Sequence, residues 1–408
     1  MLESMVQAIW HLKVFQDRKN KSDFMFSKRV VFWSACAGML LFGICIITLG
    51  SVVADLRLKL NLNEIASGTL FSILPIGIIA GSVLFGPIAD RNGYRMLLFI
   101  SALVMSAGFF GIAYTSSEFM LKVFILLVGL GGGSINGATN ALVSDISETG
   151  KGANISLLGV FYGVGALGMP LVLGLVRNTL DFEIIVASVG ILTILTAIFF
   201  LVIKFPPPKL TKSAPFSQTI DLAKDKALLL IAFFLFFQSG FEGIINNWTT
   251  TYMVSTLAVE QSSALYALTL FVAGLVAMRL LTGSIFRSLT PQQLLIISFA
   301  LTLTGLIILK MSSSYNLSVI GLIALGAGLA GGFPIMLGIA GSLFAGLSGT
   351  AFSIIFFIAL AGNTIINFLM GLVAQHSGVA HLITFAMAEV LVMAFLAILI
   401  LKRSKQVK

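Results

Sequence analysis

Two long apolar runs of this chain are joined by the charged turn Gly86-Pro87-Ile88-Ala89-Asp90-Arg91-Asn92-Gly93-Tyr94-Arg95. The turn places one carboxylate and two guanidinium groups where two apolar segments must leave a lipid bilayer. Its glycines permit a close approach of helices and a tight reversal of the chain. The spacing G-x-x-x-D-R-x-G-x-R therefore predicts a short, charged connection between two membrane-spanning helices.

The composition of the chain agrees with a lipid environment. Of its 408 residues, 58% are hydrophobic and 10% are charged, whereas soluble domains carry about 25% charged residues. A spanning helix needs roughly 20 apolar residues. We predict an all-α membrane protein with twelve spans, at 30–53, 67–89, 95–115, 120–143, 154–177, 183–204, 227–252, 263–285, 293–311, 315–339, 348–374 and 381–402.

The net charge of +9 is distributed unevenly over the predicted loops. Nineteen of the 25 Lys and Arg residues fall on the side of the two termini, and five fall on the other side. This positive-inside bias predicts an integral protein of the plasma membrane, in bacteria the inner membrane, with both termini in the cytoplasm. Topology and membrane lipid therefore account for the basic charge, and we expect no nucleic-acid partner.

A polar interruption at 205–226, which contains three consecutive prolines, divides the spans into six and six. One offset of 197 residues carries Gly43 to Gly240, Gly86 to Gly283, Gly129 and Gly131 to Gly326 and Gly328, and Gly174 to Gly371. We therefore expect a basic N-terminal segment at 1–29, a six-helix bundle at 30–204, a cytoplasmic linker at 205–226, a second six-helix bundle at 227–402 and a tail at 403–408. In the second half Arg287 stands where the first half has Asp90.

The seventh predicted span carries polar side chains at membrane depth. Gln238, Glu242 and Asn246 recur every four residues and are expected to form one polar stripe, beside Asn247 and Trp248. Amide and carboxylate groups bind sugar hydroxyls, and an indole offers an apolar face to a sugar ring. The stripe is either a binding site or a satisfied hydrogen-bond network, and we favour binding because an unpaired carboxylate is costly in lipid.

Other polar residues within the predicted spans are open to more than one interpretation. Asn136 and Asn140 in the fourth span are candidate ligands or interhelical contacts, and Asn363 and Asn367 in the eleventh repeat their spacing. Arg279 could pair with Glu242 or bind an anion, although we expect it to extend towards the cytoplasmic edge. Glu389 is expected to be a packed residue without a direct role.

The topology, linker, repeat and charged turn together resemble those of the major facilitator superfamily of secondary transporters, over nearly the whole chain. The resemblance implies two six-helix pseudo-repeat bundles, with the first, fourth, seventh and tenth helices lining a central cavity. Asn136, Asn140 and the Glu242 stripe would then face one another. The Gly-rich fifth span, from Gly159 to Gly174, is similar to a motif of antiporters in that superfamily.

The resemblance also implies that the charged turn acts as a cytoplasmic gate. Asp90 is expected near the start of the third helix, where the helix dipole favours a carboxylate. Arg91 and Arg95 would reach Asp145 and Glu148 at the end of the fourth span. Together with Gly86 and Gly93, these residues would close one side of the protein in one state and release it in the other.

Two sequences are similar to the fucose/galactose/glucose symporter branch: Gly-Phe-Glu242-Gly with Asn247, Trp248 and Tyr252, and Asn136-Gly-Ala-Thr-Asn140. Two positions depart from proton-coupled members. The first span has no acid at its middle, since Asp55 lies at its outer end, and Ile125 stands where many members have arginine. Glu242 is then the best candidate for ion coupling, by H⁺ or Na⁺.

We therefore predict a monomeric transporter of a small polar solute, a sugar, that uses an H⁺ or Na⁺ gradient. The first alternative is an exporter of amphipathic drugs or metabolites, and the second is a non-transporting membrane sensor. The sequence contains no Walker loop, no Gly-x-Ser-x-Gly elbow and no His/Cys cluster with metal-ligand spacing. We thus expect neither an enzyme nor a cofactor or metal site.

Overall fold

The computed structural model describes residues 26–62, 64–176, 179–209 and 221–406. Within these ranges, twelve helical segments are long and apolar enough to cross a membrane. The expectations for residues 1–25 and for the linker between 210 and 220 lie outside the described residues. The helices are α2 (Lys28–Leu60), α3 (Glu64–Asn92), α4 (Tyr94–Tyr114), α5 (Glu118–Ile146), α6 (Lys151–Val176), α7 (Phe182–Val202), α9 (Lys226–Leu257), α10 (Gln261–Gly283), α11 (Pro291–Met311), α12 (Tyr315–Leu329), α13 (Gly332–Leu343), α14 (Ser348–Ser377) and α15 (Leu382–Gln406).

Local sequence signals set several helix boundaries. Asp225 begins α9 because its carboxylate accepts hydrogen bonds from the backbone N–H groups of Ala227 (2.7 Å) and Leu228 (3.0 Å). Thr290 and Gln293 form a capping box at the start of α11. Gly93 alone separates α3 from α4, with a positive φ of 78° that glycine adopts without strain.

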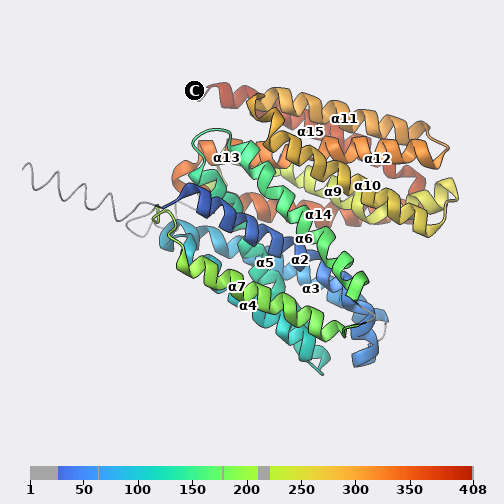
Figure 1. The fold of residues 1–408 in the computed structure, drawn as a ribbon. Helices are drawn as coiled ribbons and strands as arrows, with labels where there is room; N and C mark the ends of the chain where they lie inside the picture. The colour runs from blue at the N-terminus through green and yellow to red at the C-terminus, as the bar shows by residue number, and fades with distance from the viewer. Residues whose placement is uncertain (1–25, 63, 177–178, 210–220, 407–408) are drawn as a thin grey trace, which may run out of the picture.

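The helices form two bundles, as predicted. Figure 1 shows α2–α7 in blue to green and α9–α15 in yellow to red, with the start of α2 and the end of α15 at the same end of the molecule. The bundles meet mainly where α3 packs on α14 and where α6 packs on α10 and α13. We call the end that holds the start of α2 and residues 204–209 the linker end.

The 197-residue offset recurs in the helix contacts. A Cβ placed on Gly129 would lie 2.5 Å from the carbonyl oxygen of Leu74, and one placed on Gly326 would lie 2.0 Å from that of Phe271. Both the glycines and their partners are related by the same offset. Glycine is needed at these positions because the two backbones touch. The two halves therefore share one packing scheme.

The tenth span differs from its prediction as a single helix over 315–339. It is divided at Ala330–Gly331 into α12 and α13. Pro334 explains the division, since it has no N–H to continue the helical hydrogen bonds. Gly137 is the corresponding residue of α5, and α5 is continuous from Glu118 to Ile146.

Candidate functional site

Asp90 joins the two bundles at the linker end. Its carboxylate is 1% exposed and accepts hydrogen bonds from the backbone N–H of Gly349 (3.2 Å) and of Thr350 (2.8 Å) and from the Thr350 hydroxyl (2.8 Å). The expected position at the start of the third helix is wrong, because α3 continues to Asn92. Asp90 lies in the last turn of α3, and the N–H groups that stabilise it belong to the N-terminus of α14.

Gly86 lets α3 approach α14 closely. Its N–H donates to the Ser353 hydroxyl (3.0 Å), and a Cβ at this position would lie 2.3 Å from the carbonyl oxygen of Gly349. The glycine of the charged turn is thus required by a contact between bundles. The hydrogen bonds of Asp90 lie one turn further along the same helix.

Lys209, a residue of the linker, completes this contact, although the sequence interpretation did not single it out. Its Nζ lies 2.8 Å from the Asp145 carboxylate and 3.7 Å from that of Asp90, and it also donates to the Ser348 hydroxyl. One cation therefore compensates two largely buried carboxylates from α3 and α5. Pro208 packs over Gly93, and its fixed φ limits the conformations of the chain just before Lys209.

Arg95 of the charged turn does not contact either of its predicted partners. Arg95 donates through Nε to the carbonyl oxygen of Leu201 (2.8 Å), at the end of α7. Asp145 is instead held by Lys209 and by the Tyr94 hydroxyl, while Glu148 pairs with Lys28. The hydrogen bond from Lys28 lowers the pKa of Glu148 below its usual value. The linker end is therefore closed by a different set of charges from the one predicted.

The corresponding contact of the second half, between α10 and α6, contains Arg279. The Ser156 hydroxyl donates to the carbonyl oxygen of Arg279 (2.9 Å), and Gly159 lies against its guanidinium group. Arg279 is 8% exposed, and its Nε has no hydrogen-bond partner among the described residues. The expected extension of Arg279 to the cytoplasmic edge is therefore wrong. Tyr162 of α6 interacts electrostatically with both Arg279 and Glu242.

Glu242 and Asn246 lie on the strip of α9 between its contacts with α12 and α14. Both side chains are partly exposed. The Asn246 amide donates to the backbone carbonyl of Glu242 (2.9 Å). The Glu242 carboxylate forms no hydrogen bond or ion pair with any residue that the structure describes. The acceptor oxygens of this partly exposed carboxylate are thus available to a ligand.

Asn136 and Asn140 occupy a similar strip on α5. Gly38 of α2 packs on Thr139 to one side, and Phe85 of α3 packs on Gly137 to the other. Asn140 donates to the Asn136 side-chain oxygen (3.1 Å) and backbone oxygen (2.9 Å), and Asn136 is partly exposed. The two amides therefore support each other, in the strip between the contacts with α2 and α3.

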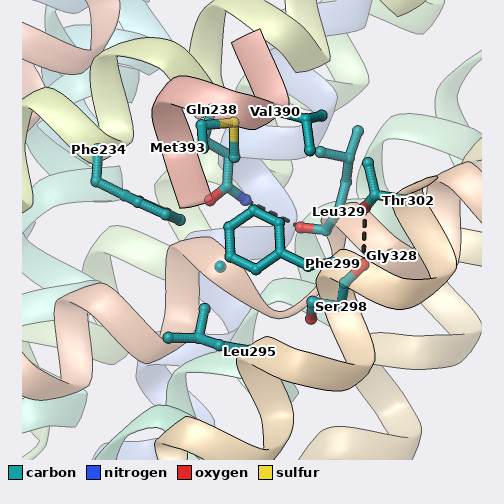
Figure 2. A pocket seen from close by; sticks show the side chains of 11 residues that line it. Phe234, Gln238, Leu295, Ser298, Phe299, Thr302, Gly328, Leu329, Val390 and Met393 are labelled. Atoms are coloured by element: carbon teal, nitrogen blue, oxygen red, sulfur yellow. Dashed lines mark hydrogen bonds between the residues drawn. The ribbon is translucent and has the colours of Figure 1, made fainter. Parts of the chain in front are cut away.

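The other candidates from the seventh span are directed elsewhere. Gln238 is 1% exposed and donates through Nε2 to the carbonyl oxygen of Leu329 (2.9 Å), inside the second bundle (Figure 2). Asn247 donates to the Asn367 side chain (2.9 Å), and the Trp248 ring lies against Gly371. The predicted stripe is thus divided, since Glu242 and Asn246 remain on one strip while these three residues contact α12 and α14.

Two further polar residues, Asn363 and Glu389, lie within the second bundle. Asn363 donates to the carbonyl oxygen of Ser239 (2.8 Å), so it joins α14 to α9. Glu389 is 5% exposed in α15, and neither carboxylate oxygen has a hydrogen-bond partner within the described part of the chain.

Comparisons with known proteins agree with this architecture. The family model of the Major Facilitator Superfamily matches residues 35–296. The chain is 26% identical over 355 residues to "Probable nitrate transporter NarT" of Staphylococcus epidermidis, covering 84% of this chain and 89% of that protein. It is 23% identical over 343 residues to the glucose/mannose transporter GlcP of Bacillus subtilis, covering 81% and 84%. Among solved structures, the E. coli fucose:proton symporter FucP superposes with a TM-score of 0.77, at 15% identity, covering 92% of this chain and 99% of that one.

Proposed function

The chain belongs to the Major Facilitator Superfamily, and we propose that it carries a small polar solute, a sugar, by alternating access coupled to an H⁺ or Na⁺ gradient. The observation that carries this proposal is the Glu242 carboxylate. It is partly exposed on a strip between two helix contacts and has no hydrogen-bond or ion-pair partner among the described residues. An ionisable group without a partner at this depth indicates a site for substrate or ion.

The neighbouring groups favour a hydroxyl-rich ligand. Asn246 lies beside Glu242, and Asn136 and Asn140 present amides from the first bundle. Such groups both donate and accept hydrogen bonds, as a sugar hydroxyl does. A glucose/mannose transporter and a fucose:proton symporter are among the similar proteins. In this proposal Glu242 binds the solute and takes part in ion coupling.

The linker end supplies the gate. Asp90, Lys209 and Asp145 hold the bundles together there, and separation of the bundles would break the hydrogen bonds to Gly349 and Thr350. A contact that is either fully made or fully broken suits alternating access. The excess of Lys and Arg at the linker end supports its assignment to the cytoplasmic side of a plasma membrane. In this proposal the protein acts as a monomer.

Transport by purified protein in proteoliposomes tests this function. We expect an imposed H⁺ or Na⁺ gradient to drive uptake of at least one labelled monosaccharide. We expect Glu242→Gln to reduce uptake by about 10-fold or more, because an amide cannot carry the charge that coupling requires. Glu118→Gln is the matched control, since Glu118 is an exposed carboxylate at the start of α5.

The decisive comparison is between gradient-driven uptake and exchange. If Glu242 couples the ion, Glu242→Gln abolishes accumulation but leaves some exchange of sugar at equilibrium. Unchanged accumulation in Glu242→Gln, or no uptake of any sugar under either gradient, contradicts the proposal.

A second candidate substrate is a small inorganic anion. Arg279 supports it, since a buried guanidinium with one unpaired N–H can bind an oxyanion. The similarity to a probable nitrate transporter favours the same class. Nitrate uptake that is lost in Arg279→Gln but retained in Glu242→Gln would support the anion and contradict the sugar.

A further inference from the structure

Two residues of opposite charge, Arg279 of α10 and Glu242 of α9, lie near the boundary between the bundles and do not pair with each other. Arg279 is 8% exposed, its Nε has no hydrogen-bond partner, and it forms no ion pair within the described part of the chain. The Glu242 carboxylate is also without a partner there. Charged groups without partners are costly at membrane depth, so both positions indicate a ligand.

Tyr162 of α6, in the first bundle, interacts electrostatically with both charges. The Arg279 guanidinium lies beside Gly159, where a Cβ would be 3.1 Å from its Nη1. Tyr162 follows Gly159 on the same helix after a rise of about 4.5 Å, and its ring packs beside that of Phe42, with the centroids 5.7 Å apart. The Tyr162 hydroxyl has no hydrogen-bond partner among the described residues. Three polar groups from α6, α9 and α10 therefore lie near one another without partners.

The packing scheme shared by the two halves does not need these three groups. The 197-residue offset relates them to uncharged residues: Arg279 to Ser82, Glu242 to Cys45 and Tyr162 to Ala359. The glycine and serine of the α6–α10 contact, by contrast, are repeated in the α3–α14 contact. The charged groups are thus added to a framework that holds without them, which favours a binding role over a packing role.

Neither of the two simpler solutes would provide partners for both charges. A neutral sugar can bind Glu242 and Asn246 through its hydroxyl groups, but it offers no charge to Arg279. A small inorganic anion can bind Arg279, but it leaves Glu242 without a partner. A solute with a carboxylate at one end and hydroxyl groups at the other satisfies both, because a guanidinium binds a carboxylate through charge-assisted hydrogen bonds.

We propose that the solute is an acidic sugar, a monosaccharide that carries a carboxylate, and that Arg279 selects it. The carboxylate binds the Arg279 guanidinium, the hydroxyl groups bind Glu242 and Asn246, and the Tyr162 hydroxyl donates to the solute between them. The two charges fix the orientation of the solute, because Arg279 attracts its carboxylate and Glu242 repels it. This inference rests on the proposed function, since it specifies the substrate class of the same site.

Uptake of matched solutes by the purified protein in proteoliposomes, under an imposed H⁺ or Na⁺ gradient, tests the inference. The solutes are labelled D-glucuronate, its uncharged methyl ester and D-glucose, which share one sugar ring. We expect kcat/KM for glucuronate to exceed that for the ester and for glucose by about 10-fold or more, as for other charge-assisted contacts. Equal uptake of all three solutes, or uptake of glucose without glucuronate, would contradict the acidic sugar.

Arg279→Gln should abolish this preference. We expect kcat/KM for glucuronate to fall by about 10-fold or more while that for glucose stays nearly unchanged, because only the charged group loses its partner. Arg279→Lys keeps the charge and should retain part of the preference. Arg287→Gln, which changes an exposed arginine just after the same helix, is the matched control and should retain all of it.

Two results with Arg279→Gln would overturn the inference. One is a preference for glucuronate that survives the substitution. The other is a parallel loss of uptake of all three solutes, which would show that Arg279 has a structural role only. If Arg279→Gln does not fold, the comparison of glucuronate with its methyl ester in the native protein decides the question.

This inference and the proposed function can fail separately. Uptake of glucose without glucuronate contradicts the acidic sugar but retains sugar transport. No uptake of any monosaccharide under either gradient contradicts the proposed function as well. Uptake of nitrate but of none of the three solutes, with loss of nitrate uptake in Arg279→Gln, would assign Arg279 to a small anion and contradict both.

Discussion

The α3–α14 contact and the α6–α10 contact are equivalent under the 197-residue offset, yet only one of them is fixed by charge. Gly86 and Ser353 in the first correspond to Gly283 and Ser156 in the second, and both serines form hydrogen bonds across the contact. In the first contact, a buried carboxylate binds the N-terminus of the opposing helix. In the second, the corresponding residue is Arg287, which is exposed.

The difference shows that a shared glycine-serine framework can hold helices together without locking them. The glycine and serine fix the distance between the two backbones. We expect the charge to set the free energy that is needed to separate the two helices. We therefore expect the linker end to open primarily by release of α3 from α14. A cysteine introduced by Ser144→Cys can report this opening, because Ser144 of α5 is buried against Gly341 of α13 and the native cysteines are also buried.

The largest effect is expected from adding a methyl group at the two equivalent glycines. In Gly86→Ala the Cβ would lie 2.3 Å from a backbone oxygen of α14, whereas in Gly283→Ala it would lie 3.0 Å from the Leu157 side chain. We expect Gly86→Ala to destabilise the closed state by about 3 kcal/mol. This corresponds to a roughly 100-fold increase in the rate of maleimide labelling of the introduced cysteine. Labelling that rises equally in both variants would show that the contacts are mechanically alike.

Asp90→Asn should have the second largest effect on the labelling rate. The amide keeps one acceptor but loses the charge that strengthens three hydrogen bonds and attracts Lys209. The expected loss is about 2 kcal/mol, or roughly 30-fold in labelling rate. Arg287→Gln is the matched control in the second half and should label like the native protein. A strong effect of Arg287→Gln would mean that the second contact is charge-dependent after all.

Lys209→Met should have a smaller effect, because Asp90 keeps its hydrogen bonds from Gly349 and Thr350 and Asp145 keeps those from Tyr94 and Ser348 when the partly exposed cation is lost. We expect about 1 kcal/mol, or about fivefold faster labelling, and a difference from the native protein that shrinks as salt screens the native pair. Lys224→Met changes another lysine near the linker and serves as the control. A difference that does not depend on salt would indicate that Lys209 acts by packing.

The smallest effect is expected from the exposed pair of Lys28 and Glu148. The pKa of Glu148 is lowered in the folded protein. Any contribution of the pair to the stability of the folded protein is therefore present above the unfolded pKa and is lost as the pH falls through the folded pKa. We expect Glu148→Gln to change labelling by less than about twofold at neutral pH. A larger change would place Glu148 among the groups that lock the linker end.

The spans could be predicted because length and hydropathy alone specify a membrane helix. The contacts of Asp90 and Lys209 could not, because they join residues that are distant in sequence, and nothing distinguishes Lys209 from the other linker lysines. The predicted stripe of Gln238, Glu242 and Asn246 is divided in the structure. Eight residues of an α-helix rotate by about 80° more than two full turns, so Gln238 and Asn246 do not point in the same direction. That rotation is enough to direct Gln238 to α12 and Asn246 towards α14.

The single-residue turn at Gly93 has a mechanical consequence. Its N–H donates to the carbonyl oxygen of Ala89 (2.9 Å), so α3 passes into α4 without slack. We therefore expect a displacement of Asp90 to be transmitted directly to α4. In the second half Ser284, a short 3₁₀ segment, Ile285–Ser288, and the two residues after it separate α10 from α11, so the same displacement can be absorbed before it reaches α11.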